Sequence, residues 1–395
     1  MMAVVAMAAT AGPVEDFIAD SRVNAPSTSL LIRNLSSGKV LATLNADQPL
    51  IPASIMKCVT SASLLKRVGK DYKYETPVYL EGRVHKGRLE GNIIVEGSGD
   101  PSLNSRSLTG APDFVTEICQ ALMKRGVTSI AGDIIVDEKH FAGPAINPAW
   151  QSGDLPHAYG TGTHGFNFED NASGKSSVKN PAGVFAARLR SRLAMNGIPV
   201  DQLVIDPSHH RELLLRHRSL PVDEIMRSCM MRSDNQFAEG LLRTLSRENG
   251  GDGSTANGAE TELKYWRKHR APVDGVKIVD GSGLSRTNRM TARFMSHLLG
   301  EMSSDPWYAS FFPLAGQEGT LRKFMAGTPL EGYLAMKTGS MRGIQCYAGY
   351  LLDDDYAPTH SIVVMFNNMS NRADSRAALA DLLSALFIPD AATQD

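Results

Sequence analysis

Short hydrophobic segments at both ends of the chain predict the strands of one antiparallel sheet. Residues 29–35 and 40–45 flank a Ser-Ser-Gly-Lys turn, a pattern typical of a β-hairpin. Toward the other end, residues 333–337, 344–352 and 361–366 predict three more strands, the last with the continuous apolar run of a buried strand. We expect the hairpin and this three-stranded meander to share a sheet, with helices near both ends of the chain covering one face.

Apolar residues at helical spacing predict helices next to these strands. Ile55, Val59 and Ala62 fall on one helical face, so that a helix begins near Ser54. After the last strand, leucines at positions 379, 382, 383 and 386 form a second apolar stripe. Residues 222–245 form a long amphipathic pattern, which predicts a long helix.

The middle of the chain, from about residue 72 to residue 210, is richer in glycine and turns. Residues 84–95 predict a hairpin and residues 130–136 a strand, whereas residues 114–126 and 181–197 predict helices. We interpret this segment as an insertion into the domain formed by the two ends of the chain.

A length of 395 residues exceeds one ordinary domain. We expect an α+β protein with a catalytic domain made of residues 13–70 and 211–395, and an inserted domain of residues 71–210. Residues 1–12 are small and apolar and contain an Ala-Thr-Ala sequence, which resembles the end of a signal peptide. The alternative for this segment is a simple apolar tail.

Composition excludes several classes of protein. With 42% hydrophobic and 21% charged residues, the chain is expected to fold into a soluble globular protein. A formal net charge of -1 argues against a nucleic-acid binder, and no stretch reaches the roughly 20 apolar residues of a membrane span. The cysteines are widely spaced, so that we expect no zinc site. We also expect no other metal and no cofactor. Two interpretations are open for the cysteines: disulfides in any of three pairings, or isolated buried thiols. The residues are Cys58, Cys119, Cys229 and Cys346.

Three short motifs carry the candidate chemistry: Ser54-x-x-Lys57, Ser233-Asp-Asn235 and Lys337-Thr-Gly. In this order they resemble the signature of class A β-lactamases and penicillin-binding proteins. Each motif alone is weak, because Ser-x-x-Lys also occurs at residues 36–39 and 176–179, and Ser-x-Asn at residues 102–104. The plain alternatives are helix N-caps for the two serine motifs and a strand followed by a turn for the third. Joint occurrence in the right order favours the catalytic interpretation.

The residue types fit acyl transfer by a serine nucleophile. The hydroxyl of Ser54 needs a base to take its proton, and Lys57 lies on the same face of the predicted helix. Lys57 acts as a base only when neutral, and burial together with the second cation Lys337 would lower its pKa. Ser233 is suited to pass the proton to the leaving amine, and Asn235 to hold a substrate amide and anchor Lys57.

The third motif is suited to binding substrate. Lys337 offers charge and Thr338 a hydroxyl donor to a substrate carboxylate. Gly339 would let the substrate backbone lie along the strand edge, as in strand addition. The backbone N–H groups of Ser54 and Ser340 would form an oxyanion hole.

From about Val14 onward, the chain resembles the S13 peptidase family, the class C low-molecular-mass penicillin-binding proteins. The resemblance implies a penicillin-binding/β-lactamase-like transpeptidase fold, a periplasmic or other extracytoplasmic location, and peptidoglycan stem peptides ending in D-Ala-D-Ala as substrates. It also implies inhibition by β-lactam antibiotics. The strings that carry it are Pro52-Ala53-Ser54 with Lys57, Gly97-Ser98-Gly99-Asp100-Pro101, Asp280-Gly281-Ser282-Gly283-Leu284-Ser285, Gly319-Thr320-Leu321 and Lys337-Thr338-Gly339-Ser340.

One departure from the family concerns the insertion. After residues 166–171, the family continues with further strands, whereas here only residues 172–180 precede the next helix. We therefore expect a shortened inserted domain. Within it, Trp150, Asp154 and Tyr159 are open to two interpretations, a pocket for the stem peptide or core packing.

Two other functions remain open. A serine β-lactamase shares the acylation machinery, but the insertion holds no Glu-x-x-x-Asn resembling the deacylating loop of class A enzymes. The second alternative function is that of a non-catalytic wall-binding homologue. The intact motif residues argue against it, because a non-catalytic homologue would be expected to have lost one of them.

Overall fold

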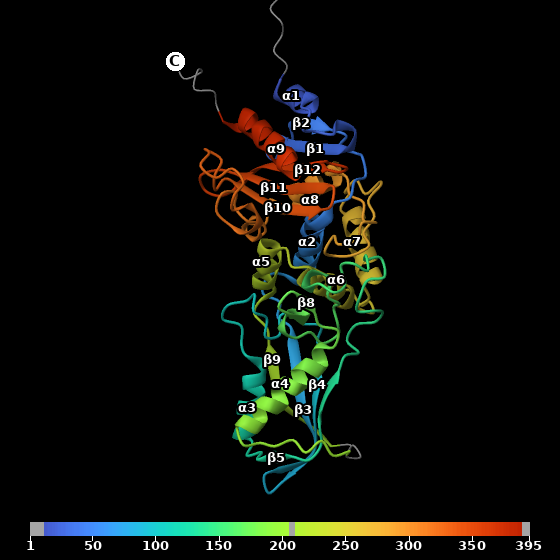
Figure 1. The fold of residues 1–395 in the computed structure, drawn as a ribbon, viewed down its shortest axis with the longest axis vertical. Coiled ribbons are helices and arrows are strands. Elements are labelled where there is room, and N and C mark those ends of the chain that lie inside the picture. Colours follow the sequence, from blue (N-terminus) through green and yellow to red (C-terminus); the bar gives the residue numbers. More distant parts are fainter. Residues whose placement is uncertain (1–11, 205–209, 389–395) are drawn as a thin grey trace, which may run out of the picture. The chain divides into compact units, whose positions relative to one another are not determined.

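The computed structural model describes residues 12–204 and 210–388, which form two compact units. The first unit holds residues 12–55, 271–277 and 288–388, and the second holds residues 56–270 and 278–287, except those left undescribed. Figure 1 follows the chain through both units. These units are not bounded as we expected for the catalytic and inserted domains, and the domain assignment stays a prediction. Of the expected signal-peptide remnant, residues 1–11 lie outside the described part.

The first unit is built on a five-stranded antiparallel sheet in the order β10-β11-β12-β1-β2. The N-terminal hairpin and the C-terminal meander therefore share one sheet, as predicted. Its elements are α1 (Pro13–Ala19), β1 (Thr28–Asn34), β2 (Val40–Leu44), α8 (Ala292–Met302), β10 (Leu334–Met341), β11 (Ile344–Leu352), β12 (Pro358–Phe366) and α9 (Arg372–Phe387).

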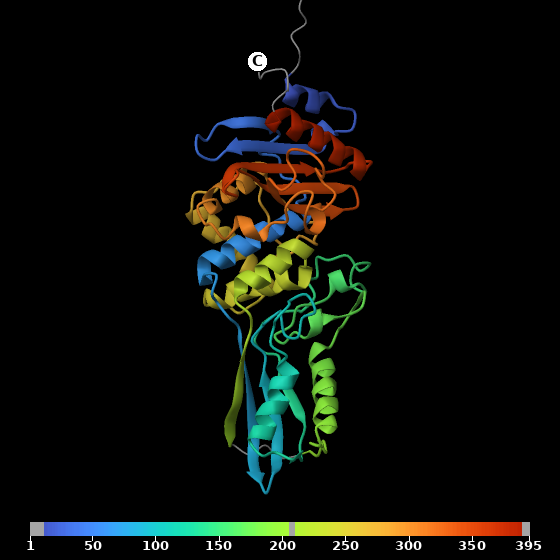
Figure 2. The same ribbon diagram turned by 90° about the vertical axis from the view of Figure 1, so that its left-hand side faces the viewer.

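Helices cover both faces of this sheet. Figure 2 shows α1 and α9 on one face and α8 on the other. On the first face, Phe17 of α1 and Leu379 of α9 pack with Ile32 and Val364 in one buried cluster. The long apolar run in β12 is explained by this sandwich, because a strand covered on both sides needs apolar residues in both directions. The helix that joins α9 on this face is α1, whereas the helix after Ser54 belongs to the second unit.

The third motif lies inside a strand and not at its end, which corrects our expectation. β10 runs from Leu334 to Met341, and Gly339 pairs with Cys346 of β11 in an unbroken register. The predicted strand ended at Lys337, and glycine weakens strands in general. Here full pairing with β11 carries the strand through the glycine.

The second unit combines a helical cluster with another five-stranded sheet. Strands run in the order β5-β4-β3-β9, with β6 also paired to β4. One buried cluster joins β3 and β4 to α3 and α4, and the rings of Phe114 and Phe185 stack in it with centroids 5.4 Å apart. The elements are α2 (Met56–Val68), β3 (Glu75–His85), β4 (Arg88–Glu96), α3 (Phe114–Lys124), β5 (Ser129–Ile130), β6 (Ile134–Asp137), β7 (Ala172–Ser173), β8 (Ser176–Ser177), α4 (Pro181–Met195), β9 (Arg211–Arg218), α5 (Val222–Arg232), α6 (Asn235–Glu248) and α7 (Thr255–Lys268).

Two predicted elements of this unit are each broken in two. The long helix over residues 222–245 divides into α5 and α6, because Ser233 ends α5 in a left-handed conformation with φ of 58°. Asp234 then caps α6 by accepting a hydrogen bond from the N–H of Phe237. The strand over residues 130–136 divides into β5 and β6 around Gly132, where a Cβ would lie 2.2 Å from Oδ1 of Asn92.

The segment in which we expected the insertion to be shortened forms a tight hairpin. β7 and β8 pair over two residues each, and α4 begins four residues later with Asn180 as its N-cap. A further set of strands has no room in so short a connection.

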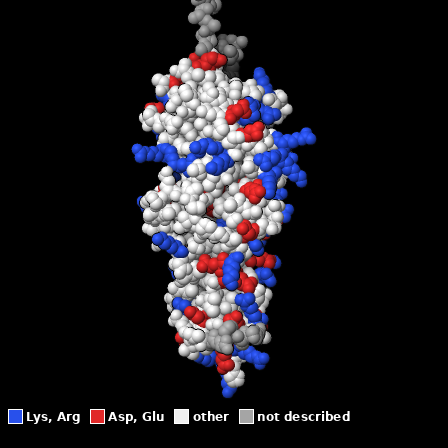
Figure 3. Space-filling model, turned by 90° about the vertical axis from the view of Figure 1, so that its right-hand side faces the viewer, with Lys and Arg blue, Asp and Glu red and all other residues white. Residues whose placement is uncertain are grey.

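Other sequence expectations concern cysteines, membrane segments and charge. All four cysteines are buried thiols, and none of them is joined in a disulfide. Among the helices described, none combines the length and apolar character needed to cross a membrane. Figure 3 shows basic and acidic side chains interspersed over one face of the molecule.

Candidate active site

Lys57 is a buried basic residue of the second unit. It lies in the first turn of α2 and is 1% exposed. Its Nζ donates to Oδ1 of Asn235 at 2.6 Å and to the carbonyl oxygen of Ser282 at 2.7 Å. Burial lowers the pKa of the Lys57 ammonium below its ordinary value. Neighbouring groups raise this pKa and act against burial; they are Cys229, Asp234, Asp280 and Glu239. A contribution from Lys337 stays a prediction.

Asn235 is the first residue of α6, and both ends of its amide are engaged. Oδ1 accepts from Lys57, and Nδ2 donates to the carbonyl oxygen of Tyr159 at 2.8 Å. Ser233 lies two residues earlier, half-buried, at the left-handed end of α5. The second motif is thus a turn between two helices, in which Asp234 is the cap predicted by the plain alternative. Because a left-handed backbone is unfavourable for serine, the surrounding structure must hold Ser233 in this conformation.

The loop over residues 280–285 supplies the second acceptor for Lys57. The buried Asp280 carboxylate accepts from the N–H groups of Gly283 at 2.9 Å and Ser285 at 2.6 Å. It also accepts from Nε1 of Trp150 at 2.8 Å. Trp150 is buried, which supports core packing for this residue.

Ser54 lies in the first unit, in the short 3₁₀ turn Ala53–Ile55 that precedes α2. Ala53 has φ of 46°, an uncommon value for a residue with a Cβ. Gly339 of β10 lies against this turn: a Cβ on it would be 2.7 Å from the carbonyl oxygen of Pro52 and 3.0 Å from the nitrogen of Ser54. The third motif therefore contacts the backbone of the candidate nucleophile.

The remaining residues of the third motif surround this contact. β10 is an edge strand, and its outer side meets residues 313–315 near Met336. Lys337 is fully buried, and its Nζ donates to the carbonyl oxygen of Thr338 at 2.8 Å. The hydroxyl of Thr338 donates to that of Thr320 at 2.8 Å, and Ser340 is exposed.

Sequence reasoning missed three parts of this arrangement. The carbonyl oxygens of Ser282 and Tyr159 and the hydroxyl of Thr320 contact predicted site residues, yet none had been given a role. Backbone acceptors leave no trace in side-chain identity, which explains the first two. The signal available for Ser282 and Thr320 was their position in the longer family-like strings.

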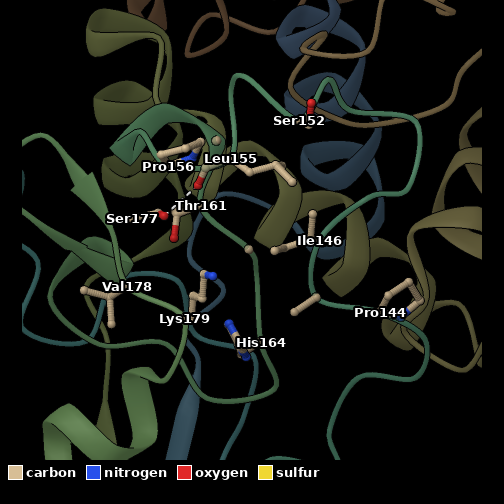
Figure 4. A pocket seen from close by; sticks show the side chains of 13 residues that line it. Pro144, Ile146, Ser152, Leu155, Pro156, Thr161, His164, Ser177, Val178 and Lys179 are labelled. Carbon is tan, nitrogen blue, oxygen red and sulfur yellow. Dashed lines mark hydrogen bonds between the residues drawn. The ribbon is translucent and has the colours of Figure 1, made fainter.

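A separate pocket of about 620 Å³ lies in the second unit beside the hairpin β7–β8. Figure 4 shows Ile146 and Leu155 on its apolar wall, with His164 and Lys179 at the opposite side. Ser177 of β8 donates to the carbonyl oxygen of Leu155 at 2.6 Å, which ties the hairpin to this wall. The segment that carries Tyr159, the partner of Asn235, continues into the lining through Gly160.

Comparison with known proteins identifies the family. The model of the D-Ala-D-Ala carboxypeptidase 3 (S13) family matches residues 10–173 and 169–386. The chain belongs to this family. The expectation of a serine-type D-Ala-D-Ala carboxypeptidase is thereby confirmed. The two matched ranges meet at residues 169–173, where we expected the family's further strands to be missing.

Relatives of known name are similar over most of their length. A D-alanyl-D-alanine carboxypeptidase of Actinomadura sp. (strain R39) is 24% identical, over 89% of this chain and 80% of the relative. Carboxypeptidase DacB of Mycolicibacterium smegmatis is 26% identical, over 90% of this chain and 79% of the relative.

Solved structures show the fold. Penicillin-binding protein 4 (dacB) from Haemophilus influenzae matches with a TM-score of 0.79 at 21% identity, covering 93% of this chain and 97% of that one. The penicillin G-acylated predatory endopeptidase Bd3459 from Bdellovibrio bacteriovorus matches with a TM-score of 0.58 at 17% identity, covering 91% of each chain. The penicillin-binding type of α+β fold, which the family resemblance implied, is confirmed.

Proposed function

We propose that the chain cleaves the D-Ala-D-Ala ends of peptidoglycan stem peptides through an acyl-enzyme on Ser54. The observation that carries this proposal is the buried amine of Lys57, held by an Asn235 oxygen and a backbone carbonyl. Membership of the family and the names of the relatives support the substrate class.

The environment of Lys57 suits a general base. A neutral amine has two N–H groups and one lone pair, and the oxygens of Asn235 and Ser282 match the two N–H groups. Burial lowers the pKa of Lys57, which favours this neutral form. The lone pair then takes the Ser54 hydroxyl proton as Oγ attacks the carbonyl carbon between the two D-alanines.

The remaining steps use the other motif residues. The N–H groups of Ser54 and Ser340 stabilise the oxyanion, and the closeness of Gly339 to the nitrogen of Ser54 supports this pairing. Ser233 passes a proton to the departing D-alanine amine, after which water cleaves the ester and restores Ser54. Lys337 and Thr338 bind the terminal carboxylate, and the edge position of β10 supports binding of an extended peptide beside it.

The substrate lies outside the cytoplasmic membrane, so we propose an extracytoplasmic location. β-Lactams would acylate Ser54 in the same way as substrate, and the acylated structural neighbour supports this inhibition. Cleavage of peptide cross-links is a further activity that the same chemistry would permit.

A fluorescent penicillin tests the proposal. We expect stable labelling of the parent, with the adduct located at Ser54 by mass spectrometry, and none in Ser54→Ala. Ser36→Ala and Ser176→Ala are matched controls, because each removes the serine of another Ser-x-x-Lys sequence, and both should keep the label.

Other outcomes point to the competing functions. Rapid turnover of the label would indicate a β-lactamase, and absence of labelling in the folded parent a wall-binding protein. An adduct on another residue would contradict the assignment of Ser54.

A further inference from the structure

The Ser282 carbonyl that accepts from Lys57 belongs to a loop tied down at successive residues. Asp280 holds the loop from within through its bonds to two backbone N–H groups. The hydroxyl of Thr60 on α2 donates to the carbonyl oxygen of Gly281 at 3.0 Å. Gly281 also packs against α6, where a Cβ would lie 2.8 Å from the carbonyl oxygen of Ala238. Such a loop has little freedom to move its carbonyl groups.

Glu239 of α6 contacts Ser282 itself. Its side chain is 2% exposed, and Oε1 accepts from the N–H of Ser282 at 2.8 Å. Asn235 and Glu239 are four residues apart, so both lie on the same face of α6. One face of α6 thus contributes to both acceptors of the Lys57 amine. Asn235 is one acceptor, and Glu239 holds Ser282, whose carbonyl oxygen is the other.

We propose that Glu239 is a positioning residue for Lys57: it fixes Ser282, so that the Ser282 carbonyl oxygen and Asn235 together orient the Lys57 amine. The second motif would then extend from Ser233 to Glu239. This inference rests on the proposed role of Lys57 as the base.

The role requires a hydrogen-bond acceptor and not a negative charge. Burial, with the nearby Asp280 carboxylate, raises the pKa of Glu239, which favours the uncharged form of this group. A glutamine has the same shape and keeps an acceptor oxygen at the position of Oε1. Alanine removes the acceptor and leaves the N–H of Ser282 unpaired in a buried site.

The experiment compares Glu239→Gln and Glu239→Ala in the full chain. Stopped-flow acylation by benzylpenicillin separates the binding constant from the rate of the chemical step, and thermal unfolding reports folding. We expect Glu239→Gln to acylate within about threefold of the parent. Glu239→Ala should lose about 10²-fold in the chemical step with little change in binding, because a misplacement of about 1 Å costs this much.

Glu248 provides matched controls on the same helix. It lies at the end of α6, where its carboxylate accepts from the hydroxyl of Tyr72 at 2.9 Å, and it has no place in the proposed machinery. Glu248→Gln and Glu248→Ala should both keep the parental acylation rate. If Glu239→Ala does not fold, Glu239→Asp replaces it, because a carboxyl one methylene shorter does not reach the N–H of Ser282. The chemical step of acylation in Glu239→Asp should then slow by the same factor as expected for Glu239→Ala.

Two results would overturn the inference: parental acylation in a folded Glu239→Ala or Glu239→Asp, or equal losses in the glutamine and alanine variants. The second result would mean that charge, and not the hydrogen bond, is what matters. Labelling of the parent at Ser54 separates this failure from failure of the proposed function. A parent that is acylated at Ser54 with no effect of Glu239 refutes only the positioning role.

Discussion

Gly339 of β10 contacts the backbone of Ser54, and a side chain in its place would lie 3.0 Å from the Ser54 nitrogen. From the sequence, we predicted that this glycine lets the substrate backbone lie along the edge of the strand. In the structure it also makes room for the turn that carries the candidate nucleophile. A Cβ contact this short is tighter than packing normally allows, so the turn would have to shift.

Gly339→Ala should therefore slow acylation as well as destabilise the fold. We expect a loss of about 1–3 kcal/mol in the free energy of unfolding, the usual cost of overpacking. Acylation by a fluorescent penicillin, measured per folded molecule, should fall because the nitrogen of Ser54 is displaced. Thermal unfolding and labelling rates of the same samples give both quantities.

Gly349→Ala is the control for this prediction. Gly349 lies on β11 in the same sheet, and a Cβ there would be 2.1 Å from the carbonyl oxygen of Ala335. This variant should also be destabilised while keeping its acylation rate per folded molecule. Equal slowing in both variants would mean that general loosening of the sheet, and not the contact with Ser54, is responsible.

Lys57→Met tests the buried amine through pH dependence. The pKa of Lys57 is lowered in the folded state by burial, so folding favours the neutral amine. Its contribution to stability is complete above the pKa of the unfolded chain and is lost as the pH falls through the folded pKa. Methionine has a similar length and no charge, so the variant should lose less stability than the parent as the pH is lowered.

The same variant should not be acylated at any pH. In the parent, acylation should rise with pH through the lowered pKa of Lys57, because only the neutral amine accepts the Ser54 proton. Urea unfolding and penicillin labelling across the pH range measure the two effects. A parental acylation rate in Lys57→Met would exclude Lys57 as the base.

The sequence predicted this site unevenly, and the reasons are physical. Side-chain chemistry is visible in sequence, so Lys57 and Asn235 could be paired in advance, and the structure brings them to 2.6 Å. The break at Ser233 was missed in the helix prediction because the apolar pattern continues across it. The helix is interrupted by the backbone of two residues, left-handed at Ser233 and extended at Asp234. The role of Ser282 depends on a backbone oxygen, which any residue type supplies.

The elements of the first unit were easier to predict than those of the second. Strands such as β11 and β12 are covered by helices and carry long apolar runs, which locate them within a few residues. β5 is only two residues long and too short to show a period. The extent of β10 beyond Lys337 depends on pairing with β11, a long-range property that no local pattern contains.

Lys337→Ala should impair acylation by carboxylate-bearing substrates more than by carboxylate-free esters. A hydrogen bond to a charged group contributes about 1.5–3 kcal/mol, which corresponds to roughly 10–150-fold in rate. Lys337 is fully buried, so Lys337→Met, which fills more of the space, accompanies it to limit destabilisation. Acylation kinetics with paired acid and ester substrates provide the measurement. Equal losses for both substrates would indicate that Lys337 acts on Lys57 electrostatically and does not bind the carboxylate.

The shortened insertion should leave activity on short substrates intact. The strands that we expect to be missing would follow residue 171, whereas Tyr159, whose carbonyl oxygen accepts from Asn235, precedes that point. A segment trimmed within its own boundaries does not force its two ends apart, so the residues that support Asn235 need not move. The hairpin β7–β8 closes the gap and is fastened to Leu155 by Ser177.

What the shortening should change is recognition of larger muropeptides, which the missing strands would have contacted. D-Alanine release from a short pentapeptide and cleavage of a cross-linked dimer measure the two cases. We expect clear activity on the pentapeptide and activity on the dimer that is weaker by about tenfold or more, equivalent to the loss of about 1.4 kcal/mol of binding. An inert pentapeptide, together with penicillin acylation at Ser54, would show that the lost strands serve ordinary substrate binding. The retained segment around Tyr159 would then support Asn235 without completing the substrate site.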